Sequence, residues 1–234
     1  MGRPVIAYHI IFGAYGFWLP NDPRGSQSRY VFAQRLALFG PPTRLREDTT
    51  LSPGEAERLR VMQGELQRPP VRFEQPQIDA IADGFGQIIS RLRLVFYATA
   101  IMPDHVHVVA ARQEMYAEDI VGYLKRAGSR QLRNAGVHPF AGLEGRRVGA
   151  AGQTRRVGAQ IRRVGAQIRR VGAAVNHAGT DAGGRLPSPW GEHGWKVFLF
   201  DLDEIEYAVT YVNDNPIEAG LPRQQWPWVR EFGS

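Results

Sequence analysis

The chain has 234 residues, of which 43% are hydrophobic and none is cysteine. This length suits one domain with additions, or at most two small domains, and the hydrophobic fraction is enough for a core. The lack of cysteine excludes disulfides, thiolate zinc sites and a cysteine nucleophile. The sequence has no apolar run of 18 residues and no signal-peptide pattern, so we expect a cytoplasmic protein without a membrane partner.

The positive charge is concentrated in one segment. The formal net charge is +6, yet residues 146–170 contain eight arginines and no acid, and the rest of the chain without them would carry −2. An anionic partner is expected for that segment. Binding of nucleic acid by the remainder has to be argued from its sites.

The N-terminal third is expected to hold one strand and one short helix. Residues 5–12, "VIAYHIIF", have the composition of a strand. The loop that follows is rich in Gly, Pro, Asn and Asp and carries Trp18 and Arg24. Further on, Ser52 with Glu55 three residues later is the capping-box pattern of a helix start.

The middle of the chain predicts a helix, a hairpin and a second helix. Apolar residues recur at helical spacing over 77–92. The segment "LVFYATAIM" and residues 105–111 are predicted strands, joined by a turn at Pro103 and Asp104. An amphipathic helix is expected over 116–134.

A near-perfect heptad repeat of "RRVGAQI" then interrupts the chain. Its regular glycine weakens any helix, and it offers too little apolar surface for a core. We interpret residues 146–186 as a flexible, Arg-rich insertion, produced by tandem duplication, within a single domain that spans 1–234. The functional alternative is a basic arm that binds the phosphate backbone.

The C-terminal part predicts a strand over 195–200 and a helix over 203–215, with Asp201 as N-cap and Pro216 as the stop signal. The order is then strand, helix, strand, strand, helix, strand, helix. This order indicates an α+β fold of the ferredoxin-like β-α-β-β-α-β kind, an antiparallel sheet with helices on one face and an extra C-terminal helix.

The stretch "MPDHVHVVA" places two imidazoles on one strand. Because strand side chains alternate, His105 and His107 share one face while Val106 and Val108 share the other. Two such rings can point at one metal ion or phosphate, or do acid/base work. Two histidines alone are an incomplete metal site, and the competing interpretation is that both are structural.

The last predicted helix carries a second stripe. Tyr207, Tyr211 and Asn215 are spaced by four residues and so lie along one face. Tyrosine can attack a phosphodiester when a metal polarises the phosphate, and an amide oxygen can join a metal shell. The alternative is an aromatic stripe that packs on the sheet.

Three segments resemble one family. "MPDHVHVV" resembles the histidine strand of the single-tyrosine HUH transposases of the IS200/IS605 type. "YVNDNPIEAGL" resembles a segment of their relatives, the REP-associated tyrosine transposases, and "AYHIIFGAYGFWLPNDPRGS" looks like the N-terminal strand and loop of that group. The resemblance covers about 1–30, 77–134 and 194–222, and the three segments occur in the family's order.

The resemblance implies a catalytic centre and a reaction. Tyr211 would be the nucleophile, and His105, His107 and Asn215 would hold Mg²⁺ or Mn²⁺. The ion would stabilise charge on the scissile phosphate of single-stranded DNA that contains a hairpin. A 5′-phosphotyrosine would conserve the bond energy, so that another 3′-hydroxyl could complete strand transfer, as in DNA transposition and recombination.

Other features leave alternatives open. Tyr123 is a competing nucleophile, and Glu218 stands where the family usually has a basic residue. The chain could instead be a metal-dependent endonuclease that uses water, or a domesticated hairpin DNA-binding protein without turnover. Relatives occur as homodimers and as monomers. Candidates for stacking and phosphate contacts are Trp18, Arg24, Lys125, Arg126 and Arg130.

Overall fold

The computed structural model describes residues 3–17, 51–142 and 186–233. The chain divides into two compact units, residues 1–141 with 188–234 and residues 142–187. The arginine repeat belongs to the second unit and lies outside the described residues. Trp18 and Arg24 of the N-terminal loop belong to the first unit and also lie outside the described residues. All of the described helices and strands belong to the first unit.

The first unit is built on a four-stranded antiparallel sheet with the order β2-β3-β1-β4. Its strands are β1 (Ala7–Ala14), β2 (Phe96–Ile101), β3 (His105–Ala111) and β4 (Trp190–Leu199). The helices are α2 (Pro53–Gly64), α3 (Gln75–Leu92), α4 (Ala117–Asn134) and α6 (Leu202–Glu218). With β1, α3, β2, β3, α4 and β4 in chain order, this is the predicted ferredoxin-like arrangement.

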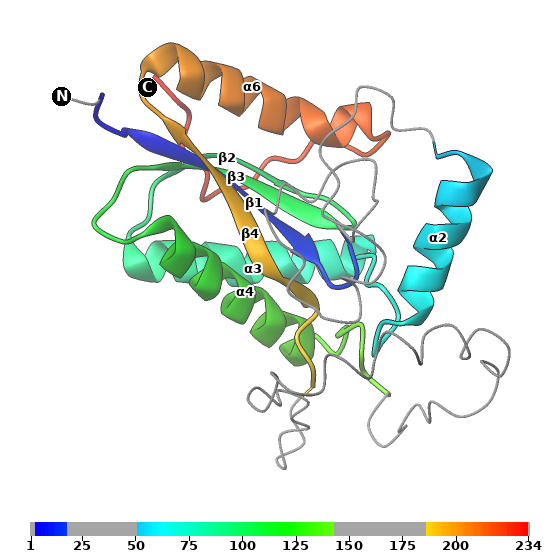
Figure 1. Ribbon diagram of the computed structural model, residues 1–234. Helices are drawn as coiled ribbons and strands as arrows, with labels where there is room; N and C mark the ends of the chain where they lie inside the picture. The colour runs from blue at the N-terminus through cyan, green and yellow to red at the C-terminus, as the bar shows by residue number, and fades with distance from the viewer. Residues whose placement is uncertain (1–2, 18–50, 143–185, 234) are drawn as a thin grey trace, which may run out of the picture. The chain divides into compact units, whose positions relative to one another are not determined.

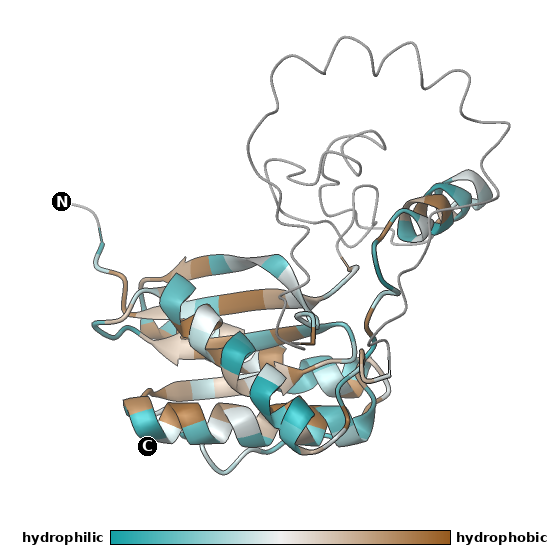
Figure 2. Ribbon diagram, turned by 90° about the horizontal axis from the view of Figure 1, so that it is seen from below, coloured by the Kyte–Doolittle hydropathy of each residue, from teal (hydrophilic) through white to brown (hydrophobic). Residues whose placement is uncertain are grey.

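Helices cover both faces of the sheet. The pair α3 and α4 packs on one face, and α6 crosses the other, over β2 and β3 (Figure 1). The pair approaches closely, because a Cβ added at Gly84 of α3 would lie 2.7 Å from the backbone oxygen of Ala127 in α4. Hydrophobic and hydrophilic residues alternate along the helices (Figure 2), as expected for helices that cover a sheet on one side only. The extra C-terminal helix therefore has a sheet face of its own.

The α6 face has a core of small and medium side chains. The sheet contributes mostly alanines, and α6 contributes apolar residues from successive turns. The buried members are Ala7, Ala98, Ala100, Met102, Val109, Leu199, Ile205, Ala208 and Val212. Short side chains on the sheet let the helix lie close to the strands.

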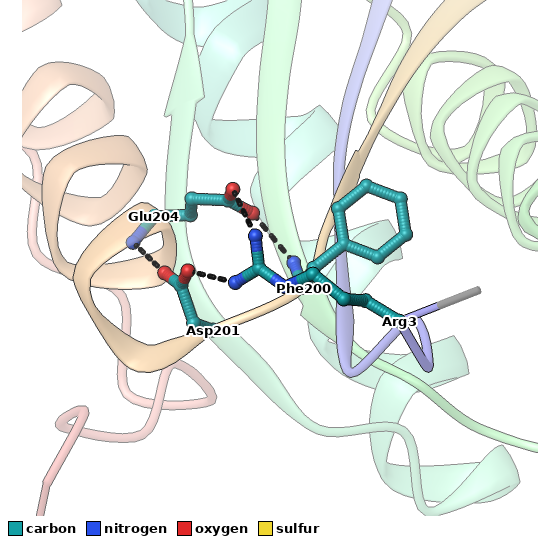
Figure 3. A network of polar contacts seen from close by, with 4 residues as sticks. All are labelled: Arg3, Phe200, Asp201 and Glu204. Atoms are coloured by element: carbon teal, nitrogen blue, oxygen red, sulfur yellow. Dashed lines mark hydrogen bonds and ion pairs between the residues drawn. The ribbon is translucent and has the colours of Figure 1, made fainter. Parts of the chain in front are cut away.

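A polar network fixes the start of α6 (Figure 3). The Asp201 carboxylate accepts a hydrogen bond from the backbone N–H of Glu204 at 2.8 Å, which confirms the predicted N-cap. The Glu204 carboxylate accepts from the backbone N–H of Phe200 at 2.6 Å. The Arg3 guanidinium pairs with both carboxylates. The Glu204 N–H and then Arg3 hold the pKa of Asp201 below its usual value.

The end of α6 differs from the prediction. Pro216 does not stop the helix, which continues to Glu218. A proline in the last turn removes one N–H from the helix, and the carbonyls of residues 215, 216 and 217 still accept hydrogen bonds from the turn that follows. Pro216 is buried against the rest of the fold, so packing offsets the lost hydrogen bond.

Strand β4 is longer than predicted. It begins at Trp190 rather than at residue 195, although Gly191 and Gly194 weaken the strand pattern. The Trp190 ring packs on Phe12 and Phe73, with ring centroids 5.5 and 5.0 Å apart. This tertiary packing overrides the local preference.

The C-terminal segment covers the edge of β2. The Gln224 side chain accepts from the backbone N–H of Ile101 and donates to its carbonyl, both at 2.8 Å. The Trp226 indole N–H donates to the Thr99 carbonyl at 3.2 Å. These bonds satisfy edge groups that would otherwise be open to another strand. None of the helices in the described part of the chain is long and apolar enough to cross a membrane.

Candidate active site

Among the side chains that the structure describes, three histidines lie on the sheet face that α6 covers. The antiparallel pairing of β1 with β3 sets Ile11 opposite His107, Gly13 opposite His105 and His9 opposite Val109. Paired residues share a face, so His9 stands diagonally next to His107, within reach of its ring. The register thus adds a third imidazole to the two of the histidine strand.

Each ring of the histidine strand has its Nδ1 atom engaged. His107 Nδ1 lies 3.0 Å from Nε2 of His9, and His105 Nδ1 lies 2.6 Å from Oδ1 of Asp104. The ring centroids of His105 and His107 are 4.7 Å apart. With Nδ1 occupied in both, Nε2 is the atom through which each ring would bind a metal ion.

Burial keeps two of the rings neutral. It lowers the pKa of His9 to about 4. Burial also lowers the pKa of His107 well below its usual value, with smaller contributions in the same direction from His105 and His9 and an opposing one from Asp104. The neutral imidazole is the form that binds metal, so at neutral pH His107 needs no deprotonation before it can act as a ligand.

Tyr211 reaches this cluster from α6. Its ring centroid lies 5.6 Å from that of His107 and 5.8 Å from that of His9, with edge-on geometry in both cases. The side chain is 43% exposed, so the phenol remains accessible. Tyr207, one turn earlier, is 76% exposed, and among the described residues it has no such ring contact. The structure therefore brings Tyr211 to His107 of β3 and His9 of β1.

Asn215 lies one turn beyond Tyr211 on α6 and is partly buried. Its role as third metal ligand stays a prediction. Within residues 3–17, 51–142 and 186–233, no group of three or more His, Cys, Asp or Glu side chains has an arrangement that could hold a metal ion. A complete shell at this site therefore needs a donor of another type, such as an amide oxygen, a substrate phosphate or water.

The predicted DNA contacts on α4 lie on the other face of the sheet (Figure 1). Lys125 donates to the Gly191 carbonyl at 2.7 Å, and burial lowers its pKa to about 8. The Arg126 guanidinium lies 4.6 Å from the ring centroid of Tyr123 on the same helix, and Arg130 is exposed. Neither these residues nor Tyr123 are gathered with the histidines, and their role in DNA binding stays a prediction.

Sequence reasoning missed His9 and Asp104 as parts of this site. The sequence pattern places Asp104 only in the turn, although it directly precedes His105. His9 is separated from His107 by 98 positions, and only the register of β1 on β3 brings them together. The signal available in the sequence was a polar residue inside an otherwise apolar strand.

Comparison with known proteins finds no matching family model and no matching curated protein. Two solved structures are similar. One is a REP-associated tyrosine transposase bound to a REP hairpin, with 8% identity, a TM-score of 0.41 and coverage of 97% of this chain and 78% of that one. The other is a putative transposase from Deinococcus radiodurans, with 16% identity, a TM-score of 0.30 and coverage of 71% and 95%. At similarity this low, function has to be argued from the residues of the chain itself.

Proposed function

We propose that the chain is a transposase-like enzyme that cleaves and rejoins single-stranded DNA through Tyr211, with a divalent metal ion held by the histidine strand. One observation carries the proposal. The accessible Tyr211 ring contacts the buried ring of His107, and both histidines of the strand have Nδ1 tied to a neighbouring side chain. A purely structural pair of histidines would not require a half-exposed tyrosine above it.

By their chemistry, the proposed ligands suit a divalent ion. His105 and His107 offer two Nε2 atoms from one strand, and Asn215 offers an amide oxygen from the helix above. Mg²⁺ or Mn²⁺ would take its remaining ligands from phosphate oxygens and water. When bound, the ion supplies electrophilic polarisation of the scissile phosphate.

The chain's own residues then account for the covalent step. The Oη atom of Tyr211 attacks phosphorus, a Tyr–O–P bond forms and the bond from phosphorus to the 3′-oxygen breaks. The tyrosine loses its proton and the leaving 3′-oxygen gains one, so the step is balanced without a further reactant. Attack by a different 3′-hydroxyl reverses the step and joins two strands.

The α6 face also offers a surface for unpaired bases. Trp195 of β4 is paired with Ile11 of β1, which is paired with His107, so the three stand in one row across the sheet. Trp195 is 38% exposed. Aromatic side chains stack on bases of any sequence, and we propose that Trp195 receives a base next to the scissile phosphate. This contact suits a single strand better than a duplex.

Charge on α6 does not attract DNA. The helix carries five acidic residues and no basic one. Its like charge raises the cost of bringing a phosphate to Tyr211, which a bound divalent ion would offset. We propose that the arginines of residues 146–170 supply the remaining attraction as sequence-independent phosphate contacts.

The test is covalent capture. End-labelled single-stranded DNA with a hairpin is incubated with protein and Mn²⁺ and then separated under denaturing conditions. We expect a protein-linked band from the natural chain, none from Tyr211→Phe, and an unchanged band from the control Tyr207→Phe. DNA binding by Tyr211→Phe should remain.

The other outcomes assign the alternatives. Cleavage by Tyr211→Phe at the normal rate, without any linked band, would identify a nuclease that uses water. Binding of hairpin DNA without cleavage in either Mg²⁺ or Mn²⁺ would identify a binding protein without turnover.

A further inference from the structure

We infer that His9 is a positioning residue that fixes which nitrogen of His107 faces the metal ion. The inference rests on the proposed function for its purpose, but its physical content concerns a single hydrogen atom between two rings. His9 and His107 are both buried, and their nitrogens are 3.0 Å apart. A contact of this length between two imidazoles holds one hydrogen.

That hydrogen has two possible places. If it sits on Nε2 of His9, neutral His107 accepts at Nδ1 and carries its own hydrogen on Nε2, where it cannot bind a cation. If it sits on Nδ1 of His107, then Nε2 of His107 has its lone pair available. Only the second arrangement is compatible with His107 as a ligand, and it makes His9 the acceptor.

His105 shows the same arrangement with a different acceptor. The buried Asp104 lies 2.6 Å from its Nδ1 atom, and an ionised carboxylate can only accept. Both rings of the histidine strand are therefore oriented through their Nδ1 atoms. The partner of His105 is a carboxylate from the turn, and the partner of His107 is an imidazole from β1. An acceptor without charge is suited to the more deeply buried ring, because a buried carboxylate would cost more to desolvate.

Tyr211 closes the contact off from water. Its ring lies edge-on to both His9 and His107. Because His9 is only 9% exposed, water cannot easily replace His107 as its hydrogen-bond partner. The hydrogen bond between the rings therefore persists, and it couples the tautomer of His107 to that of His9.

The first measurement needs neither metal nor DNA. Long-range ¹H–¹⁵N correlation spectra of the full chain report which ring nitrogen of each histidine carries hydrogen. We expect His107 to be protonated on Nδ1 in the natural chain and to become a mixture of tautomers in His9→Leu. Protonation of His107 on Nε2 in the natural chain would overturn the inference, whether or not any variant folds.

The second measurement is Mn²⁺ binding, followed by the loss of the free-ion electron paramagnetic resonance signal. We expect His9→Leu to weaken binding by roughly 10- to 100-fold, the usual effect of losing an orienting partner. His9→Gln, whose amide oxygen can accept near the position of Nε2, should restore most of the affinity. The control His138→Phe replaces a buried imidazole elsewhere and should leave Mn²⁺ binding unchanged.

Two results would contradict a positioning role. Unchanged Mn²⁺ affinity in His9→Leu would show that the tautomer of His107 is set by something else. A loss as complete as that of His107→Ala, without rescue by His9→Gln, would show that His9 is itself a ligand. Absence of a DNA-linked band would reject the proposed function, while the tautomer of His107 would still decide the inference.

Discussion

The two faces of the sheet are formed by alternate residues of the same strands, yet they differ in side-chain size and polarity. Toward α3 and α4 the strands present large apolar groups such as Phe12 and Phe96, which are fully buried. Toward α6 the same strands present Ala98, Ala100 and the histidines, and the cover includes a half-exposed tyrosine. The contrast is sharpest within β3, where histidine and valine alternate.

Along each strand, residues that stabilise the fold therefore alternate with residues that face the proposed active site. Burying a neutral imidazole costs free energy that has to be offset elsewhere, and large apolar groups offset it best. The face toward α3 and α4 carries them. Alanines on the other face stabilise less but allow α6 to lie close enough for Tyr211 to contact His9 and His107. Each face can therefore be perturbed without the other.

The largest expected contrast is between neighbours on β3. His105→Ala removes a proposed metal ligand and should lower the yield of the DNA-linked band from folded protein by at least about 10³-fold. It should also cost about 1–3 kcal/mol in stability, because the buried Asp104 carboxylate loses its hydrogen-bond partner. Val106→Ala should lower the free energy of unfolding by about 2 kcal/mol and leave cleavage by the folded protein intact. Cleavage assays and urea unfolding check both. Equal loss of cleavage in the two variants would contradict the division.

The next contrast is between neighbours on β1. Phe12 is fully buried against Phe85 and Trp190, with ring centroids 6.3 and 5.5 Å away. Phe12→Ala should lower the free energy of unfolding by about 3–5 kcal/mol, since it leaves a cavity between α3 and the sheet. Ile11→Ala, on the α6 face and only partly buried, should cost about 1 kcal/mol. Denaturant midpoints at constant slope measure both, and similar costs would show that the α6 face is equally important for stability.

The features that the sequence predicts correctly are those that depend on local patterns of residues. Alternation on β3 placed His105 and His107 on one face, helical spacing placed Tyr211 and Asn215 on one stripe, and the order of elements predicted the fold. Capping chemistry at Ser52 and Asp201 is local too, and both caps are present.

What the sequence did not predict depends on contacts between distant residues. His9 belongs to the site because β1 pairs with β3 in one particular register. Trp190 extends β4 because it packs on Phe12, and Pro216 is tolerated because it is buried in the last turn of α6. Local propensity is a weak prior in each case, and tertiary packing decides the outcome.

Acid should weaken the α6 face through its buried imidazoles. Burial lowers the pKa of His9 to about 4, below the unfolded value of 6.5, so between these pH values the unfolded chain binds more protons than the folded one. The contribution of neutral His9 to the free energy of unfolding should therefore be complete above pH 6.5. It should be lost as the pH is lowered toward 4, which reduces the free energy of unfolding by up to about 3 kcal/mol.

Urea unfolding at a series of pH values tests this expectation. His9→Gln, which cannot titrate, should lose less stability than the natural chain over the same range. Parallel curves for the two proteins would show that His9 does not contribute to acid sensitivity. Burial also lowers the pKa of His107 and lowers that of His138 to about 4, so both should remain as sources of acid sensitivity in both proteins.

The smallest change tests the close approach of α6. Ala100 is fully buried beneath α6 and is paired with His107, so Ala100→Val adds volume between the helix and the sheet. We expect a loss of about 1–3 kcal/mol in stability from overpacking. The added volume should also move Tyr211 slightly away from the histidines, which should lower the yield of the DNA-linked band by up to about 10²-fold. Unfolding and cleavage are measured on the same samples.

Ala110→Val is the matched control, since Ala110 is equally buried but is paired with Phe96 and Tyr8 on the opposite face. It should lose a similar amount of stability while the folded fraction keeps its cleavage activity, because the strain falls between the sheet and α3 or α4. A cleavage loss as large in Ala110→Val as in Ala100→Val would mean that the two faces are mechanically coupled through the strands. Loss confined to Ala100→Val would mean that the alanines beneath α6 hold the tyrosine in reach of the histidines.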